Sequence, residues 1–322
     1  MEIDCFIDIN EKSDKSTQTD FGFENFLVNN DEKLKAFTGI SIPILRAVVE
    51  SAEEVANFNN KKVKDLMLKV IIVLVKIRLN LPYTCLAILF NLSTSSVSRY
   101  FYSILSLLSV SMKPLIYWPT KEEIIANLPK CFEKYSNTRA VIDCTEIKVD
   151  RCKCLKCRIL TYSHYKSTHT LKYLIAITPS GLISFVSSGY GGRTSDKAIF
   201  NKEKLIDKFD PHDGIMVDKG VLIEKECEEN FLKLIRPPFL RKKSQFSKLD
   251  AEKTADIARA RVHVERSIER MKMFHILQYQ LSWYLVPYTD DIVKEVACLV
   301  NLSPPIMADD KFVVIEHFSE DY

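Results

Sequence analysis

The spacing of apolar residues changes near residue 139, and this change divides the chain into two parts that must fold differently. From Ser41 to about Pro129, apolar residues recur at intervals of three and four, which is the spacing of one helix face. From Arg139 onward, short runs rich in β-branched residues alternate with turn residues, which is the pattern of strands. A chain of 322 residues is long enough for two folded units. We therefore expect a helical module followed by an α/β domain.

The second part predicts a mixed sheet with helices on both faces, because its strands come first and its helices are interleaved later. The turn Pro179-Ser180-Gly181 is suited to join two of the strands as a hairpin. The expected strands are 140–149, 171–178, 182–188, 214–217 and 231–235, and the expected helices are 196–209, 223–230, 251–274 and 290–302.

The distribution of charge separates the ends of the chain from its folded parts. Residues 1–34 contain nine acids and three bases, and they lack sustained apolar periodicity. Such a segment buries too little apolar surface to offset the entropy of ordering. We expect four regions: a disordered acidic tail, a helical module, an α/β domain and a C-terminal tail, at 1–35, 36–130, 135–305 and 306–322.

Two basic regions flank the parts of the chain that carry the candidate chemistry. Residues 148–172 contain seven bases and one acid, and residues 233–272 contain twelve bases and five acids. Clustered bases are the electrostatic signature of phosphate binding, although the net charge is only +3. They favour a nucleic acid over a small substrate.

Cysteine spacing and hydropathy exclude two other classes of protein. The nine cysteines are unevenly spaced and no secretory signal precedes them, so a disulfide framework is not expected. The longest apolar run, 66–79, includes three basic residues and is too short to span a bilayer. We expect a buried helix there and no membrane association.

Three acidic residues stand where the sheet can bring them together. Asp143 lies inside an apolar strand, Asp218 ends the short strand 214–217, and Glu265 lies at the margin of the apolar stripe of helix 251–274. A charged residue in an apolar strand is costly to bury unless it is paired or binds a metal. The alternative for each acid is a surface or salt-bridged side chain, and Arg261 lies one turn from Glu265.

The sequence motifs around these acids resemble those of one family. They are similar, in order and with sensible gaps from about Arg139 to Pro305, to the DDE superfamily endonuclease domain of PIF/Harbinger-like transposases. The matching motifs are Asp143-Cys144-Thr145-Glu146, Tyr162-Ser163-His164-Tyr165-Lys166, Ile177-Thr178-Pro179-Ser180-Gly181, Gly191-Gly192-Arg193-Thr194-Ser195-Asp196-Lys197, Val217-Asp218-Lys219-Gly220 and Arg261-Val262-His263-Val264-Glu265-Arg266.

The resemblance implies an RNase H-like fold and catalysis with one or two divalent cations, Mg²⁺ or Mn²⁺. It implies that Asp143, Asp218 and Glu265 are both the catalytic and the metal-binding residues. Glu146 and Asp196 fall in matching motifs and are assigned a supporting role. The alternative for Glu146 is an acid at a strand edge, and the alternative for Asp196 is a helix N-cap. The Cys-rich THAP zinc module that often begins related proteins is not found in this sequence.

Residues 81–107 read as a helix-turn-helix, a motif that commonly precedes this nuclease domain. Ser93 is expected to cap the second helix, and Asn91 tolerates the left-handed backbone of such a turn. Four side chains would then face outward for DNA phosphates or base edges: Thr94, Ser95, Ser98 and Arg99. A helical pair used only for packing is the alternative, because Arg99 is the one basic residue among them.

Two short motifs stand apart from this pattern. Cys152, Cys154 and Cys157 offer three thiols near His164 or His169, but their spacing is not that of a standard zinc finger. We interpret them as incidental thiols in a basic loop, with a structural zinc as the alternative. The segment from Lys15 to Asp20 resembles the peptide bound by the dynein light chain, with a solvated tail as the alternative.

The sequence therefore favours a nuclear transposase-derived endonuclease that cuts and joins double-stranded DNA. The resemblance also implies a possible partner, a second DNA-binding protein encoded by the same element. A domesticated DNA-binding protein that keeps the fold without cleavage is the second hypothesis, although all three acids are present. A metal hydrolase of small substrates is the third, and the flanking basic regions disfavour it.

Overall fold

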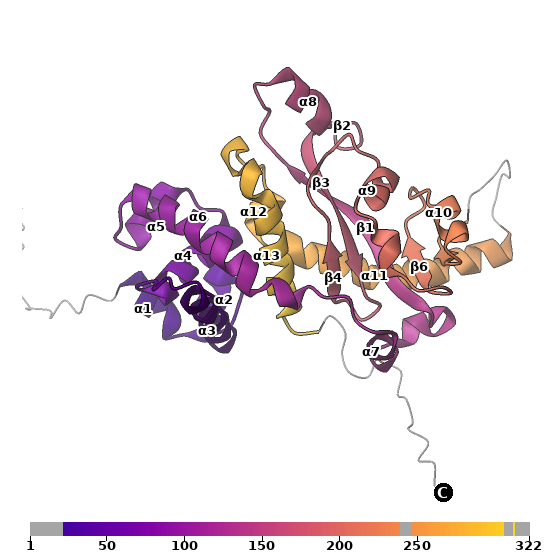
Figure 1. Cartoon of the computed structure of the whole chain (residues 1–322), viewed down its shortest axis with the longest axis horizontal. Coiled ribbons are helices and arrows are strands. Elements are labelled where there is room, and N and C mark those ends of the chain that lie inside the picture. The colour runs from indigo at the N-terminus through magenta and orange to yellow at the C-terminus, as the bar shows by residue number, and fades with distance from the viewer. Residues whose placement is uncertain (1–21, 239–246, 306–311, 313–322) are drawn as a thin grey trace, which may run out of the picture.

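The computed structural model describes residues 22–238, 247–305 and 312. Helices occupy its N-terminal part, and a twisted sheet with flanking helices occupies the rest (Figure 1). The change of apolar spacing near residue 139 therefore marks the change of architecture, since the first strand begins at Thr138.

Two short helices begin the described chain, where the sequence predicted a tail. They are α1 (Phe23–Val28) and α2 (Asp31–Thr38), and the side chain of Asn30 caps α2 by accepting from the backbone of Lys33. Leu27 and Leu34 are fully buried. The prediction of an unpacked tail over 1–35 is therefore wrong for residues 23–35, because one buried leucine in each helix is too sparse to give a periodicity. Residues 1–21, including the segment from Lys15 to Asp20, lie outside the described residues.

Four longer helices complete the helical module: α3 (Ile42–Phe58), α4 (Leu66–Leu79), α5 (Tyr83–Leu89) and α6 (Thr94–Ser111). Helix α4 is apolar on every side and runs through the middle of the module, in contact with α2, α3 and α6. The prediction of a buried helix at 66–79 is confirmed. No helix among the described residues is long and apolar enough to cross a membrane.

The predicted helix-turn-helix is formed by α5 and α6. Asn91 has a φ of 50°, in the left-handed region, and the Ser93 hydroxyl accepts a hydrogen bond from the backbone of Ser96. Val97 and Phe101 on α6 are fully buried. The two expectations for the turn, a left-handed Asn91 and a capping Ser93, are confirmed.

The α/β part is built on a sheet of seven strands within the described residues, in the order β2-β3-β1-β6-β7, with β4 and β5 also paired to β3. Strand β1 is antiparallel to β3 and parallel to β6, and β6 is parallel to β7. The strands are β1 (Thr138–Lys148), β2 (Tyr162–Ser163), β3 (Thr168–Ile177), β4 (Ile183–Val186), β5 (Tyr190–Gly191), β6 (Gly214–Val217) and β7 (Lys233–Ile235). This is the mixed sheet that the sequence predicted.

Alternate side chains of the strands enter two separate cores, one on each face of the sheet. Val141 and Met216 belong to the core shared with the helical module, α11 (Lys248–Lys272) and α13 (Thr289–Asn301). Ile142 and Val217 belong to the core beneath α9 (Asp196–Lys202) and α10 (Glu224–Glu229). We call these two sides the α11 face and the α9 face.

Several shorter elements were not expected from the sequence. They are η1 (Lys113–Leu115), α7 (Lys121–Ala126), η2 (Lys130–Tyr135), α8 (Leu155–Thr161), α12 (His275–Gln278) and η4 (Trp283–Tyr288). The helix expected over 196–209 ends at Lys202, and a 3-10 turn, η3 (Leu205–Lys208), follows it. Lys204 between them has a φ of 50°, which interrupts the helix.

Candidate active site where two parallel strands separate

Asp143 and Asp218 come together where the parallel pairing of β1 with β6 ends: Asp143 lies in the middle of β1 and Asp218 directly follows β6. Ile142 pairs with Val217 in the parallel register, so the two aspartates occupy the next position of each strand. Asp143 shares the side-chain alternation of Val141, which points to the α11 face. The parallel pairing thus brings together two acids that are 75 positions apart in the sequence.

Asp143 is held largely inside the protein. Its Oδ1 accepts a hydrogen bond of 2.8 Å from the backbone nitrogen of Cys144. Burial raises the pKa of the Asp143 carboxyl, and the nearby charges of Asp218 and Asp196 raise it further, while the Cys144 amide and Arg261 oppose the rise. A carboxyl that is costly to ionise and close to other acids favours a bound cation.

Asp218 is paired with an arginine from the long helix. Arg261 Nη1 on α11 lies 2.7 Å from Asp218 Oδ1, with 13% of the arginine side chain exposed and 52% of the aspartate. This contact places Asp218 on the α11 face together with Asp143. Arg261 was not assigned to the site from the sequence, although it stands one helical turn before Glu265 in the same sequence motif.

Glu265 is exposed on α11 and does not join the two aspartates. Among the described residues, no three His, Cys, Asp or Glu side chains gather in a way that could hold a metal. The structure therefore assembles two members of the predicted acidic set, and the arginine one turn before Glu265, Arg261, reaches Asp218 instead.

The two supporting acids lie on the α9 face, joined by a lysine. Lys172 Nζ is 3.1 Å from Asp196 Oδ1 and 3.5 Å from Glu146 Oε1, and Thr170 donates a 2.7 Å hydrogen bond to Glu146 Oε2. Lys172 faces Glu146 directly in the antiparallel register. Ser195, rather than Asp196, supplies the side chain that caps α9. Lys172 was missed in the sequence because the pairing of β1 with β3 is needed to place it.

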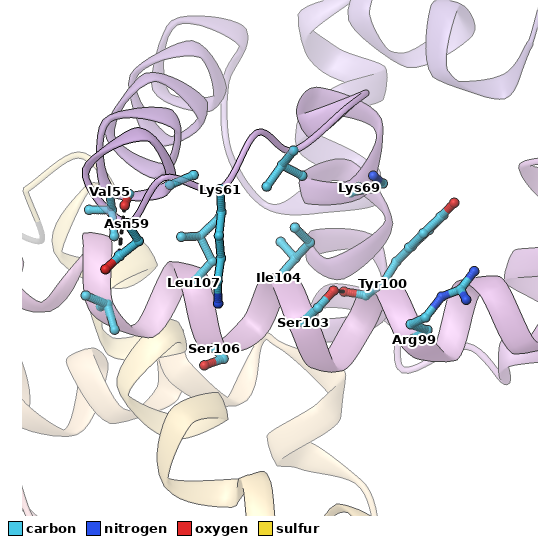
Figure 2. Close-up of a pocket in the computed structure, with 13 residues that line it drawn as sticks. Val55, Asn59, Lys61, Lys69, Arg99, Tyr100, Ser103, Ile104, Ser106 and Leu107 are labelled. Carbon is cyan, nitrogen blue, oxygen red and sulfur yellow. Dashed lines mark hydrogen bonds between the residues drawn. The ribbon is translucent and has the colours of Figure 1, made fainter.

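The predicted DNA-facing residues lie at the start of α6. Thr94, Ser95 and Arg99 are exposed and Ser98 is half-buried. Arg99 also borders a pocket of about 430 Å³ between α6 and the end of α3, together with Lys61 and Lys69 (Figure 2). The pocket thus carries two cations besides Arg99, namely Lys61 and Lys69, which come from elements other than α6.

Comparison with known proteins explains the two parts of the chain. Residues 142–301 match the family described as DDE superfamily endonuclease. The chain contains a DDE endonuclease domain. Residues 61–114 match the helix-turn-helix of DDE superfamily endonuclease, which covers α4, α5 and α6. No curated protein matches the chain, and no solved structure matches it.

The DDE endonuclease domain begins within β1 and ends with α13, so it includes both assembled aspartates and α11. Its mixed sheet, flanked by helices and preceded by a helix-turn-helix, is the RNase H-like architecture expected from the sequence. The two domains together imply that the protein binds DNA. The two matched domains together indicate a transposase-derived nuclease.

The three thiols of the predicted basic loop lie close together before and within α8. The backbone nitrogen of Cys154 donates to Cys152 Sγ at 3.3 Å. Contacts from the Cys157 backbone and thiol lower the pKa of Cys154, whereas the same thiol–thiol hydrogen bond with Cys154 raises the pKa of Cys157. Cys152 is buried and Cys154 is exposed.

We expect the purified protein to contain no stoichiometric zinc, because the Cys-x-Cys-x-x-Cys spacing departs from that of standard zinc sites. Elemental analysis of the full chain measures this directly. One zinc per chain that disappears in Cys157→Ser, but not in Cys85→Ser on α5, would instead make this loop a structural zinc clip.

Proposed function

We propose that this protein is a divalent-metal-dependent DNA endonuclease and strand-transfer enzyme of PIF/Harbinger-like transposase origin. The observation that carries the proposal is that Asp143 and Asp218 directly follow the last paired residues of β1 and β6, inside a domain that matches the DDE superfamily endonuclease. DDE endonuclease domains generally use divalent metals for cleavage. The absence of a THAP module from the sequence is part of the same proposal.

The two aspartates fit a hard divalent cation. Both offer carboxylate oxygens, the ligands that Mg²⁺ and Mn²⁺ prefer, and one of the carboxyls is largely buried beside the other. When bound, such a cation polarises a phosphodiester and lowers the pKa of an attacking water or 3′-hydroxyl. We assign Asp143 and Asp218 as its protein ligands, with Glu265 on α11 as the third member of the set.

Arg261 and Lys172 have separate tasks in this proposal. Arg261 partly neutralises Asp218, and it ties α11 to the end of β6 through the 2.7 Å ion pair. Lys172 keeps Glu146 and Asp196 together on the opposite face of the sheet and so fixes β1, β3 and α9 relative to one another. These two acids support the fold around Asp143 rather than bind the metal.

A domesticated DNA-binding protein is the second candidate, and it is favoured because Glu265 forms no metal-binding group with Asp143 and Asp218 among the described residues. In that case Arg261 would satisfy Asp218 permanently, and the helix-turn-helix would carry the remaining function. A nuclear location follows for either candidate, because their substrate is chromosomal DNA. A second element-encoded protein and a dynein light chain at the segment from Lys15 to Asp20 remain proposed partners.

The proposal is tested with a supercoiled plasmid that carries the genomic sequences flanking the coding region. The full chain should nick or linearise this plasmid in Mg²⁺ or Mn²⁺ and leave it intact with a chelator. Binding of these sequences without any cleavage in either metal would support the domesticated candidate instead.

We expect Arg99→Ala to weaken binding of the full chain to duplex DNA and to reduce its salt dependence. Loss of one phosphate contact lowers the slope of log affinity against log salt concentration by about one. Fluorescence anisotropy at several salt concentrations measures both quantities. Arg46→Ala, an exposed arginine on α3 of the same module, serves as the control. Equal losses in the two variants would argue against a specific role for the start of α6.

A further inference from the structure

A second pocket lies where the helical module meets the DDE endonuclease domain, away from Asp143 and Asp218. Its volume is about 310 Å³, within the range of small-ligand sites. Its walls come from the end of α6, η1, β4, η3 and α13. In Figure 1, α13 lies between the helical module and the sheet, and the contacts of α13 with α6, η1 and β4 define this junction.

The pocket is lined by Glu295, an acid with no partner. Glu295 is fully buried, and neither Oε1 nor Oε2 has a hydrogen-bond partner among the described residues. The indole Nε1 of Trp118, which also lines the pocket, is buried and equally without a partner there. Burying such groups costs free energy unless something bonds to them. These two acceptors and one donor border the pocket but are closed off from solvent, so a ligand that bonds to them must first move the side chains that cover them.

The charged groups and aromatic rings around Glu295 restrict the chemical class of the ligand further. Lys113, Lys208 and Lys294 line the pocket against the two acids Asp291 and Glu295, so the pocket favours a ligand with a negatively charged part. Lys208 Nζ lies 5.9 Å from the ring centres of both Trp118 and Phe185. Aromatic surface beside lysines is the combination that receives a base together with its phosphate.

We propose that this pocket binds a guanine nucleotide. The adjacent N1–H and N2–H groups of guanine match the two oxygens of one carboxylate, and the three lysines suit the phosphate. Adenine and cytosine each offer one donor beside an acceptor on the same edge, so an ionised carboxylate favours guanine over both. The nucleotide is either free in solution or an unpaired guanine within a DNA strand. This inference goes beyond the proposed function, because it requires neither Asp143 nor cleavage.

Proton release accompanies this binding. Burial raises the pKa of Glu295 to about 8, with Asp291 adding to the rise. The other charged or titratable groups that line the pocket are Cys298, Lys113, Lys208 and Lys294. Burial also raises the pKa of Cys298, so this thiol stays protonated. Affinity for guanine nucleotides should therefore rise as the pH rises toward and through about 8, because ionised Glu295 accepts both guanine N–H groups.

Trp118 provides a direct signal for the test. The chain has two tryptophans, so Trp283→Phe in the full chain leaves Trp118 as the only one. GMP should change its fluorescence saturably, and AMP and CMP should bind at least tenfold more weakly. Glu295→Gln in the same background should lower the affinity for GMP at least tenfold. Lys62→Gln, which changes an exposed lysine outside the pocket, should leave this affinity unchanged. Circular dichroism confirms that each variant is folded.

Oligonucleotides distinguish the two sources of guanine. A single-stranded oligonucleotide with one guanine is compared with the same strand lacking it, each with Glu295 and with Glu295→Gln. Saturable GMP binding supports a free nucleotide, and a Glu295-dependent preference for the guanine strand alone supports a nucleotide within DNA. A lack of response to both probes, equal binding of AMP and GMP, or an unchanged affinity in Glu295→Gln would overturn the proposal.

Discussion

Asp143→Asn is expected to reduce Mg²⁺-dependent strand cleavage by at least about 1000-fold, equivalent to about 4 kcal/mol of transition-state stabilisation. Asparagine keeps the volume of the side chain but removes the anionic ligand that lies beside Asp218. The fold should survive, because Asp143 is largely buried and its carboxyl is costly to ionise there. Cleavage rates of the plasmid and DNA affinity should be measured on the same preparations.

Glu146→Gln is the matched control for this loss, because Glu146 lies on the opposite face of the same strand and bonds to Thr170 and Lys172. It should lower the rate far less than Asp143→Asn. Glu265→Gln should behave like Asp143→Asn if Glu265 completes the metal site. A rate in Glu265→Gln equal to that of wild type would remove Glu265 from the catalytic set and leave two aspartates.

Glu295→Gln is expected to make the stability of the metal-free, nucleotide-free protein less sensitive to rising pH. The unfolded carboxyl ionises near its ordinary pKa of 4.5, whereas burial raises the folded pKa to about 8. Wild type therefore loses stability as the pH rises through this interval, because only the unfolded state releases the proton. Between pH 5 and pH 8.5 the variant should gain roughly 4 kcal/mol of unfolding free energy relative to wild type.

Chemical denaturation of both proteins at the two pH values measures this difference. Glu53→Gln, which changes an exposed acid on α3, should have the same unfolding free energy as wild type at both pH values. If Glu295→Gln and wild type keep the same difference at pH 5 and pH 8.5, then Glu295 ionises normally in the folded protein. That outcome would mean that water or a side-chain movement satisfies the carboxylate in solution.

Local patterns were enough to predict five of the seven strands within the described residues and one of the acids, whereas the two-residue strands β2 and β5 are too short to give a pattern. A carboxylate inside the apolar run of β1 is costly without a partner, and this cost alone marks Asp143 as a candidate. The hairpin between β3 and β4 and the turn at Asn91 followed from residue preferences of short segments. The same rule applies to Glu295, an acid on the buried side of the amphipathic helix α13, which was not recognised from the sequence.

Long-range pairing set the limit of these predictions. Arg261 is 43 positions from Asp218, and Lys172 is 24 from Asp196, so neither contact has a local signature. The helical position of Glu265 suggested that it could lean toward the sheet, yet α11 leaves it exposed and turns Arg261 toward Asp218. Only the packing of α11 on the sheet decides which side chain reaches the aspartates.

The most direct test of the metal-dependent active site is to compare wild type with Asp218→Asn on the plasmid that carries the flanking sequences. We predict that wild type cleaves in Mg²⁺ and that Asp218→Asn binds the same DNA with unchanged affinity but does not cleave it. Cleavage by Asp218→Asn at the wild-type rate would contradict the assignment of Asp143 and Asp218 as the catalytic pair.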